Sequence, residues 1–294
     1  MGKTFSKNEH KIAETLSVGT IFDFKGEKLK VLRVAKPTVA SGECKTDIYI
    51  EAEDNHSKKY EFKISYKQEN AQFIENKMKA ERAEALLGSD WMKIIKSGTT
   101  QIKREFECRP IIIKKGRFNG SITLGWKYEL LDVKSGKLST KLKLTKKQIL
   151  DIYSGENLPV DKKDAMVDGV RIPNSGVANY MLRTDELDDP QVLINNLQTI
   201  DEYVDEHPDV YFACKALNYR TFEGKFDGDR PLAVQIDWEV QEEKLLPVFS
   251  YDSPLIRKGN EMASKLFETL RELNINNTDD ISSENFCRPD LINE

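Results

Sequence analysis

The sequence predicts an α/β protein whose first half carries a mixed sheet flanked by helices. Three observations support this class. Short runs alternate apolar and polar residues, longer runs carry an apolar residue every three or four positions, and Gly, Pro or Asn residues separate them. At 294 residues the chain is long enough for one large domain or two modest ones.

The N-terminal elements are a helix and a hairpin. Ser6 is a good N-cap and Glu9, three residues later, completes a capping box. We therefore expect a helix over 6–16, ended by Gly19. The alternation over 20–35, with Gly at the turn, predicts a β-hairpin.

A second hairpin is expected between Lys45 and Lys67. An apolar run at 48–50 is followed by a polar break that carries Asp54 and by an alternating run at 60–66. Since successive side chains of a strand point to opposite faces, one face of the second run reads as core and the other as polar. The apolar face holds Phe62, Ile64 and Tyr66, and the polar face holds Glu61, Lys63 and Ser65.

The polar face of this hairpin predicts a divalent-cation site. Asp47 heads the first strand and Glu61 lies on the second, so we expect their carboxylates to converge on Mg²⁺, which takes hard oxygen ligands. Lys63 lies two residues further on. An ammonium there orients an attacking water or offsets charge on a phosphoryl group.

These residues resemble the PD-(D/E)XK nuclease superfamily. Thr46-Asp47 stands in the place of Pro-Asp, and Glu61-Phe62-Lys63 is the second half of the motif. Residues 42–50 and 63–73 look like type II restriction endonucleases, whereas the rest of the chain hardly contributes. The resemblance implies a restriction-endonuclease-like central sheet and Mg²⁺-dependent hydrolysis of double-stranded DNA at a defined sequence, with Asp47, Glu61 and Lys63 as catalytic residues. A palindromic target calls for a homodimer.

Other interpretations of the motif remain open. With 32% charged residues, acid-x-Lys triplets also occur elsewhere, and an ordinary hairpin with a solvated charged face explains the same pattern. The strongest rival is Glu43-x-Lys45 with Asp23, which we rank lower because Glu43 lies in a predicted loop. Glu14, on the first helix, is either a second metal-site acid or a surface residue.

DNA contacts are assigned around the motif and in the second half. A helix expected over 68–87 begins with amide side chains, which pair with adenine edges or donate to phosphates. A polar loop at 219–230 carries arginines, which favour guanine. The candidate residues are Lys45, Ser65, Lys67, Gln68, Asn70, Gln72, Arg220 and Arg230.

Net charge argues mildly against a nucleic-acid partner, and its distribution answers part of that objection. The total is -4, yet basic residues greatly outnumber acids between Lys103 and Lys147, where phosphate contacts are therefore possible. That segment is also expected to hold strands at 109–113, 120–131 and 138–144, with a helix from Lys146 behind the Thr145 cap. Its basic residues are Lys103, Arg104, Arg109, Lys114, Lys115, Arg117, Lys127, Lys134, Lys137, Lys141, Lys143, Lys146 and Lys147.

The loop-like stretch 154–173 is the best boundary candidate. We expect a nuclease core at 1–153 and a C-terminal α+β half for recognition or dimerisation at 154–294, which together can also form one continuous domain. In the second half, helices are expected at 190–206 and 254–273 and strands at 209–217, 231–240 and 246–251, with a frayed tail at 274–294.

Several function classes are excluded. The four cysteines and three histidines are too dispersed for a zinc ribbon or a disulfide framework. No run is long and apolar enough for a membrane span, and the N-terminus lacks the apolar core of a signal peptide, so we expect a cytoplasmic protein. Two alternatives to a restriction enzyme remain: a repair or junction-resolving nuclease without base specificity, and a non-catalytic DNA-binding or phage-type structural protein.

Overall fold

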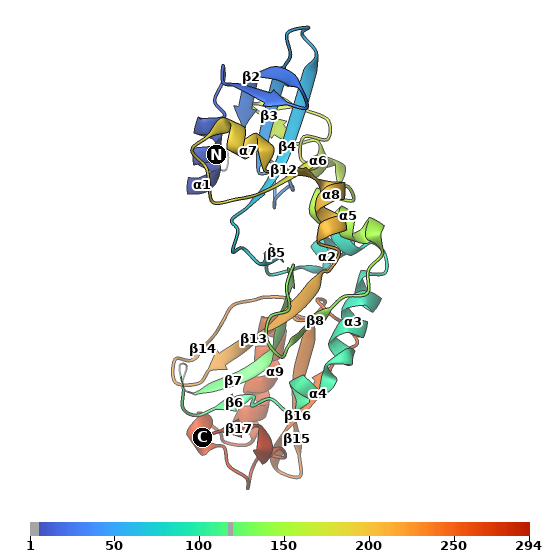
Figure 1. The fold of residues 1–294 in the computed structure, drawn as a ribbon. Helices are drawn as coiled ribbons and strands as arrows, with labels where there is room; N and C mark the ends of the chain where they lie inside the picture. The colour runs from blue at the N-terminus through green and yellow to red at the C-terminus, as the bar shows by residue number, and fades with distance from the viewer. Residues whose placement is uncertain (1–5, 117–119) are drawn as a thin grey trace. The chain divides into compact units, whose positions relative to one another are not determined.

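The computed structural model describes residues 6–116 and 120–294, so Arg117 of the basic segment lies outside the described residues. The chain forms a mixed α/β fold with two curled mixed sheets, one in each of two compact units (Figure 1). Unit 1 comprises 1–72, 85–88 and 144–208, and unit 2 comprises 73–84, 89–143 and 209–294. The boundary expected at 154 therefore lies within unit 1. None of the described helices is long and apolar enough to cross a membrane.

Unit 1 opens with the predicted helix and hairpin. Helix α1 (Lys7–Thr15) begins at Ser6, whose side chain accepts from the Glu9 backbone N–H while the Glu9 side chain accepts from the Ser6 N–H. This capping box was predicted from sequence and is confirmed. Strands β1 (Ile21–Phe24) and β2 (Glu27–Ala35) form the expected antiparallel hairpin.

The second hairpin is also confirmed. Strand β3 (Ile48–Glu53) pairs antiparallel with β4 (Lys59–Lys67), with Ile48 opposite Ile64 and Glu51 opposite Glu61. The side chain of Asp54 closes the turn by accepting from the backbone N–H groups of His56 (2.8 Å) and Lys58 (3.0 Å). The register is thus set by the turn.

Strand β11 (Tyr180–Arg183) makes the unit 1 sheet mixed, because it runs parallel to β4. The strand order is β1-β2-β3-β4-β11-β12, with β12 at Leu197–Thr199. The remaining elements of unit 1 are α5 (Lys146–Ser154), α6 (Val160–Lys163), β9 (Met166–Val167), β10 (Val170–Arg171), α7 (Pro190–Asn195) and α8 (Ile200–Glu206). Helix α5 starts at its predicted cap, Thr145, in a second capping box.

The core of unit 1 lies on the predicted apolar face of the hairpin. Helices α1 and α7 cover this face through Ile12 and Leu193, which pack with buried strand residues such as Ile50, Phe62 and Ile64. The buried cluster on the opposite face is smaller, and in it Tyr49 packs with Val167 of β9. The two-residue alternation therefore gave the correct core face.

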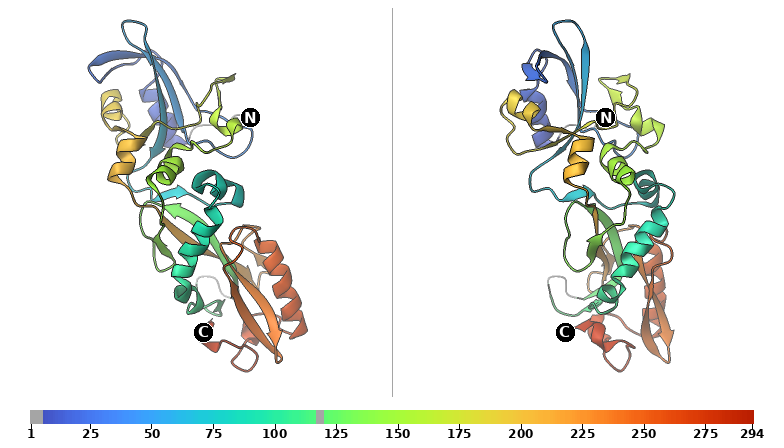
Figure 2. Two further views of the ribbon diagram at one scale, coloured as in Figure 1. Left: turned by 90° about the vertical axis from the view of Figure 1, so that its right-hand side faces the viewer. Right: turned by 45° about the vertical axis from the view of Figure 1, so that its right-hand side comes forward.

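Unit 2 is built on a larger sheet of order β14-β13-β7-β15-β16, to which β5, β6, β8 and β17 attach. Helix α9 packs on β15 (Figure 2). The strands are β5 (Phe73–Glu75), β6 (Ile112–Ile113), β7 (Ser121–Leu131), β8 (Ser139–Lys141), β13 (Tyr211–Arg220), β14 (Lys225–Phe226), β15 (Val234–Gln241), β16 (Lys244–Ser250) and β17 (Ile292–Asn293). The helices are α3 (Trp91–Gln101), α4 (Lys103–Glu107), α9 (Gly259–Glu272) and the 3-10 turns η1 (Thr278–Asp280) and η2 (Pro289–Leu291), while α2 (Ala80–Leu87) spans segments of both units.

Some of the expected elements differ from the structure. The helix expected over 68–87 is wrong in its first half, which forms a loop and strand β5, so only α2 remains helical. The helix expected over 190–206 is interrupted by β12, which pairs with β11. The tail at 274–294 is not frayed, because Ile281, Phe286 and Leu291 are buried in it.

Candidate metal centre

The carboxylates of Asp47 and Glu61, which the sequence predicted to converge, lie apart in the structure. The Asp47 backbone N–H donates to the Ile64 carbonyl (2.8 Å), so Asp47 lies beside residues 64–66 of β4. Glu61 lies opposite Glu51, nearer the turn. At about 3.3 Å per residue, the three to five intervening positions place Glu61 roughly 10–16 Å from Asp47 along the strand. The prediction that they share one metal ion is therefore wrong.

Glu61 and Lys63 have other surroundings. The Glu61 carboxylate accepts the hydroxyl proton of Tyr49, whose pKa is raised by burial and then by this hydrogen bond. Lys63 lies opposite Tyr49, and its backbone N–H donates to the Asn179 side chain (2.7 Å). The same amide donates to the Glu61 carbonyl (3.0 Å), so Asn179 pins this part of β4 to the segment before β11.

Asp47 instead lines a cavity of about 110 Å³ together with Glu9 of α1 and with Glu43, an exposed acid of the loop before β3. The Asp47 carboxylate oxygen Oδ2 accepts from the Tyr66 backbone N–H (2.8 Å) and lies 3.5 Å from the Ser65 hydroxyl. Lys36 directly follows β2, and its ammonium donates a hydrogen bond to the Glu9 carboxylate. Helix α1 and the segment 36–47 between β2 and β3 thus supply this cavity.

The electrostatics single out Asp47. Its pKa is raised from 3.8 to about 6, chiefly because burial disfavours the charged form. The Tyr66 backbone hydrogen bond opposes the rise in pKa, the negative charge of Glu9 adds to it, and the positive charges of Lys67 and Lys36 oppose it. A half-buried acid with a shifted pKa beside a second acid and two lysines is a feature typical of functional sites.

Cys44 lies in the same cavity. Burial and the nearby Asp47 charge raise the pKa of its thiol to about 11, so it is a protonated thiol at neutral pH. Its Sγ donates to the Thr46 carbonyl at 3.3 Å. We assign Cys44 no chemical role.

The sequence interpretation missed two residues of this cavity. Glu9 was given only a capping role, whereas Glu14, the acid considered for the metal, pairs with His10 at 3.2 Å and is 60% exposed. Lys36 received no role. The backbone N–H of Asp54 donates to the Lys58 carbonyl and so pairs the two residues across the turn. Asp47 precedes Asp54 by seven positions and Ser65 follows Lys58 by seven, so Asp47 and Ser65 lie level with one another. That count identifies the correct end of the hairpin.

The predicted DNA-contact residues fall into two groups in unit 1. Lys45 is buried, and Ser65 and Lys67 belong to the surroundings of Asp47. The amide side chains are exposed on a loop after β4 instead of on a helix. We call residues 68–72, which include Gln68, Asn70 and Gln72, the amide loop.

Arg183 of β11 fixes the amide loop. Its guanidinium donates to the Glu69 carbonyl (2.9 and 3.1 Å), to the Ala71 carbonyl (3.1 Å) and to the Tyr203 hydroxyl (3.1 Å). A planar guanidinium has several donors in a rigid arrangement, so it can hold two carbonyls at once. The loop backbone is therefore ordered while its amide side chains stay exposed.

Unit 2 contributes two predicted DNA-contact residues. Arg220, at the end of β13, pairs with Asp227 (2.8 Å) and Glu223 (3.3 Å), which commits its guanidinium to acids instead of guanine. Arg230 is exposed. Strand β14 and its turn occupy the loop that was expected at 219–230.

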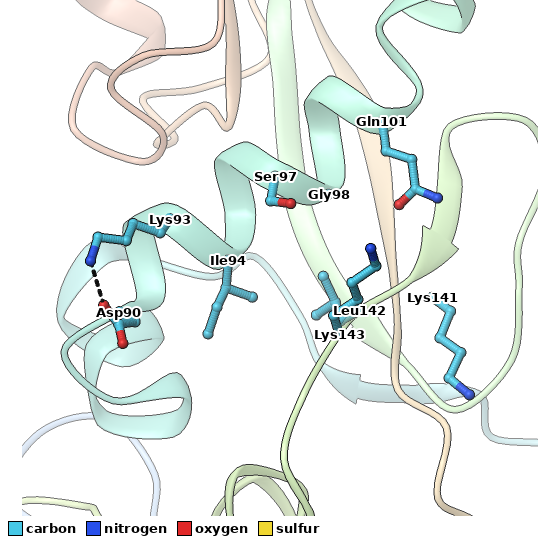
Figure 3. A pocket seen from close by; sticks show the side chains of 9 residues that line it. All are labelled: Asp90, Lys93, Ile94, Ser97, Gly98, Gln101, Lys141, Leu142 and Lys143. Carbon is cyan, nitrogen blue, oxygen red and sulfur yellow. Dashed lines mark hydrogen bonds and ion pairs between the residues drawn. The ribbon is translucent and has the colours of Figure 1, made fainter.

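Unit 2 also has a wider groove, of about 290 Å³, between α3 and residues 141–143 (Figure 3). Of its three lysines, Lys93 pairs with Asp90 (3.0 Å) and Lys141 with Asp209. Lys143 is exposed at the rim. The groove lacks the pair of carboxylates that marks the unit 1 cavity.

Within the described residues, no cluster of three or more His, Cys, Asp or Glu side chains suits a metal ion. No family model, curated protein or solved structure matches the chain.

Proposed function

We propose that unit 1 is a Mg²⁺-dependent nuclease domain that hydrolyses phosphodiesters of double-stranded DNA, with Asp47 and Glu9 as its metal ligands. One observation carries this proposal. The carboxylates of Asp47 and Glu9 line one cavity, and the charges of Glu9, Lys67 and Lys36 all act on Asp47.

The residues present fit Mg²⁺. This ion takes oxygen ligands and is commonly held by one or two carboxylates, with water and substrate phosphate completing its coordination. A cavity of about 110 Å³ has room for an ion and several waters, since a water occupies about 30 Å³ of liquid. When bound, the ion lowers the pKa of a ligated water and offsets charge on the phosphoryl group.

The chain's own residues orient the reacting groups. The backbone N–H of Tyr66 holds the Asp47 carboxylate in place at the end of β4. Lys67 follows directly and takes the role that the sequence interpretation gave to Lys63. Its ammonium orients the attacking water or offsets negative charge on a phosphate oxygen.

The sheet supports the same proposal. The hairpin that bears Asp47 is extended by the parallel strand β11, with helices over one face, as the resemblance to restriction endonucleases implies. The amide loop follows Lys67 directly and has an ordered backbone, which suits base reading because bidentate amide contacts require fixed geometry. On these grounds we propose sequence-specific cleavage, and we propose a homodimer because a palindromic target calls for one site per strand.

The test is cleavage of supercoiled plasmid DNA with Mg²⁺ and with EDTA. We expect cleavage by the wild type with Mg²⁺ alone, and at least about a thousandfold loss for Asp47→Asn, because electrostatic and metal-site groups contribute several kcal/mol each. Glu61→Gln is the matched control and should cleave within about threefold of wild type, since it keeps an acceptor for Tyr49. Loss of activity in Glu61→Gln with retention in Asp47→Asn contradicts the proposal.

The same gel separates the alternative functions. Discrete fragments indicate a site-specific enzyme, and a smear indicates a repair or junction-resolving nuclease. DNA binding without cleavage at any Mg²⁺ concentration indicates a non-catalytic DNA-binding protein. Size-exclusion chromatography with light scattering tests the homodimer.

A further inference from the structure

We infer that Lys36 is an internal counter-cation of the metal centre, which neutralises Glu9 until a divalent cation displaces it. The inference rests on the proposed function, because it concerns the same two carboxylates. It adds that the metal binds in competition with a residue of the chain itself.

The contact between Lys36 and Glu9 is sheltered. The Lys36 ammonium donates to Glu9 Oε2, and the two side chains are 19% and 14% exposed, respectively. The same oxygen accepts from the Ser6 backbone N–H at 2.9 Å. A cation that binds Glu9 through this oxygen therefore has to replace the ammonium.

The charges of the cavity favour such an exchange. Glu9 and Asp47 carry like charges into one cavity and therefore repel one another, and the Lys36 ammonium, which is paired with Glu9, offsets this repulsion. Once a divalent cation binds the two acids, the ammonium becomes a like charge next to the ion. Lys36 therefore stabilises the metal-free site and opposes metal binding.

A lysine of α1 provides a comparison. Lys11 pairs with Asp188, but these side chains are 45% and 88% exposed. Solvent screens an exposed pair, so its loss has little effect on a site elsewhere. Lys11→Gln is thus a control that changes the net charge by the same amount as Lys36→Gln.

The experiment is isothermal titration calorimetry of the full chain with MgCl₂ alone. We expect Lys36→Gln to bind Mg²⁺ about tenfold more tightly than wild type, since a competing, largely buried cation has been removed. Lys36→Arg keeps the charge and should bind like wild type, as should Lys11→Gln. Thermal denaturation gives a second readout, in which Mg²⁺ should raise the melting temperature of Lys36→Gln more than that of wild type.

Each outcome decides between the two proposals. If Asp47→Asn abolishes Mg²⁺ binding but Lys36→Gln binds like wild type, the metal site stands and the inference about Lys36 is overturned. If the gain of Lys36→Gln persists in a Glu9→Gln background, Lys36 does not act through Glu9 and the inference is also overturned. If Asp47→Asn binds Mg²⁺ as well as wild type, the proposed metal site falls, and the role of Lys36 falls with it.

Discussion

Asp47 and Glu61 belong to one hairpin, yet they meet different surroundings at its two ends. Asp47, at the open end, is half-buried beside Glu9 and two lysines, and its pKa is raised to about 6. Glu61, nearer the turn, is exposed and accepts the Tyr49 hydroxyl. The two acids have the same chemistry, so the difference comes from strand register and from what packs at each end.

The comparison shows how a short motif misleads. An acid-x-Lys triplet fixes which side chains share a face of β4, but it does not fix which of them lies level with Asp47. The register places Ser65 there, and Lys67 then has the position relative to Asp47 that was expected of Lys63. The open end of the hairpin therefore holds the proposed metal site, whereas the residues nearer the turn have a structural role.

Replacing Lys67 or Lys63 by Met should give the largest difference in cleavage rate between the two ends of the hairpin. We expect Lys67→Met to reduce plasmid cleavage about a thousandfold, because its charge acts on Asp47 and on the substrate phosphate. Lys63→Met should stay within about threefold of wild type. The measurement is the initial cleavage rate at saturating Mg²⁺. The reverse order of effects contradicts the assignment of the site to the open end.

A smaller effect is expected on the free energy of unfolding, which should depend on pH through Asp47 at the open end of the hairpin. Because the folded protein raises the pKa of Asp47 from 3.8 to about 6, it binds more protons than the unfolded chain in that pH window. Stability therefore falls as pH rises through the window, and the cost at pH 7.5 is on the order of 3 kcal/mol. Asp47→Asn removes this cost.

We accordingly expect Asp47→Asn to be more stable than wild type at pH 7.5 in EDTA, by up to about 3 kcal/mol. The advantage should disappear below about pH 3, where the carboxyl is largely protonated in both states. Urea denaturation across this pH range measures it. A variant that is less stable than wild type at pH 7.5 shows that Asp47 is a structural residue.

The smallest effect is expected at the turn end. Tyr49→Phe removes the hydrogen bond to Glu61 without opening a cavity, and should cost about 1 kcal/mol of unfolding free energy. Cleavage should be unchanged. Urea denaturation and the plasmid assay together check this, and a loss of cleavage larger than tenfold restores a catalytic role for the turn end.

Local signals in the sequence predicted much of the fold. The capping boxes at Ser6 and Thr145 start helices where expected, because each needs only residues three positions apart. The alternation in β4 gave its buried face correctly, since it follows from strand geometry alone. These features depend on neighbours within a few residues.

The parts that failed depend on distant residues. The segment after β4 is helical by composition, but Arg183, more than a hundred positions away, holds two of its carbonyls in a loop. The helix expected over 190–206 is interrupted because β12 pairs with β11. Likewise, Glu9 reaches Asp47 only through the packing of α1 on the sheet, and Lys36 only through the pairing of β2 with β3, neither of which a motif spacing reveals.

The most direct test is to locate the metal ion. Crystals soaked in Mn²⁺, which takes the same oxygen ligands as Mg²⁺, give an anomalous signal at the ion. We predict a peak bound by Asp47 and Glu9, with Lys36 displaced from Glu9. A peak at Glu61, or Glu9 still paired with Lys36 beside a fully occupied ion, contradicts it.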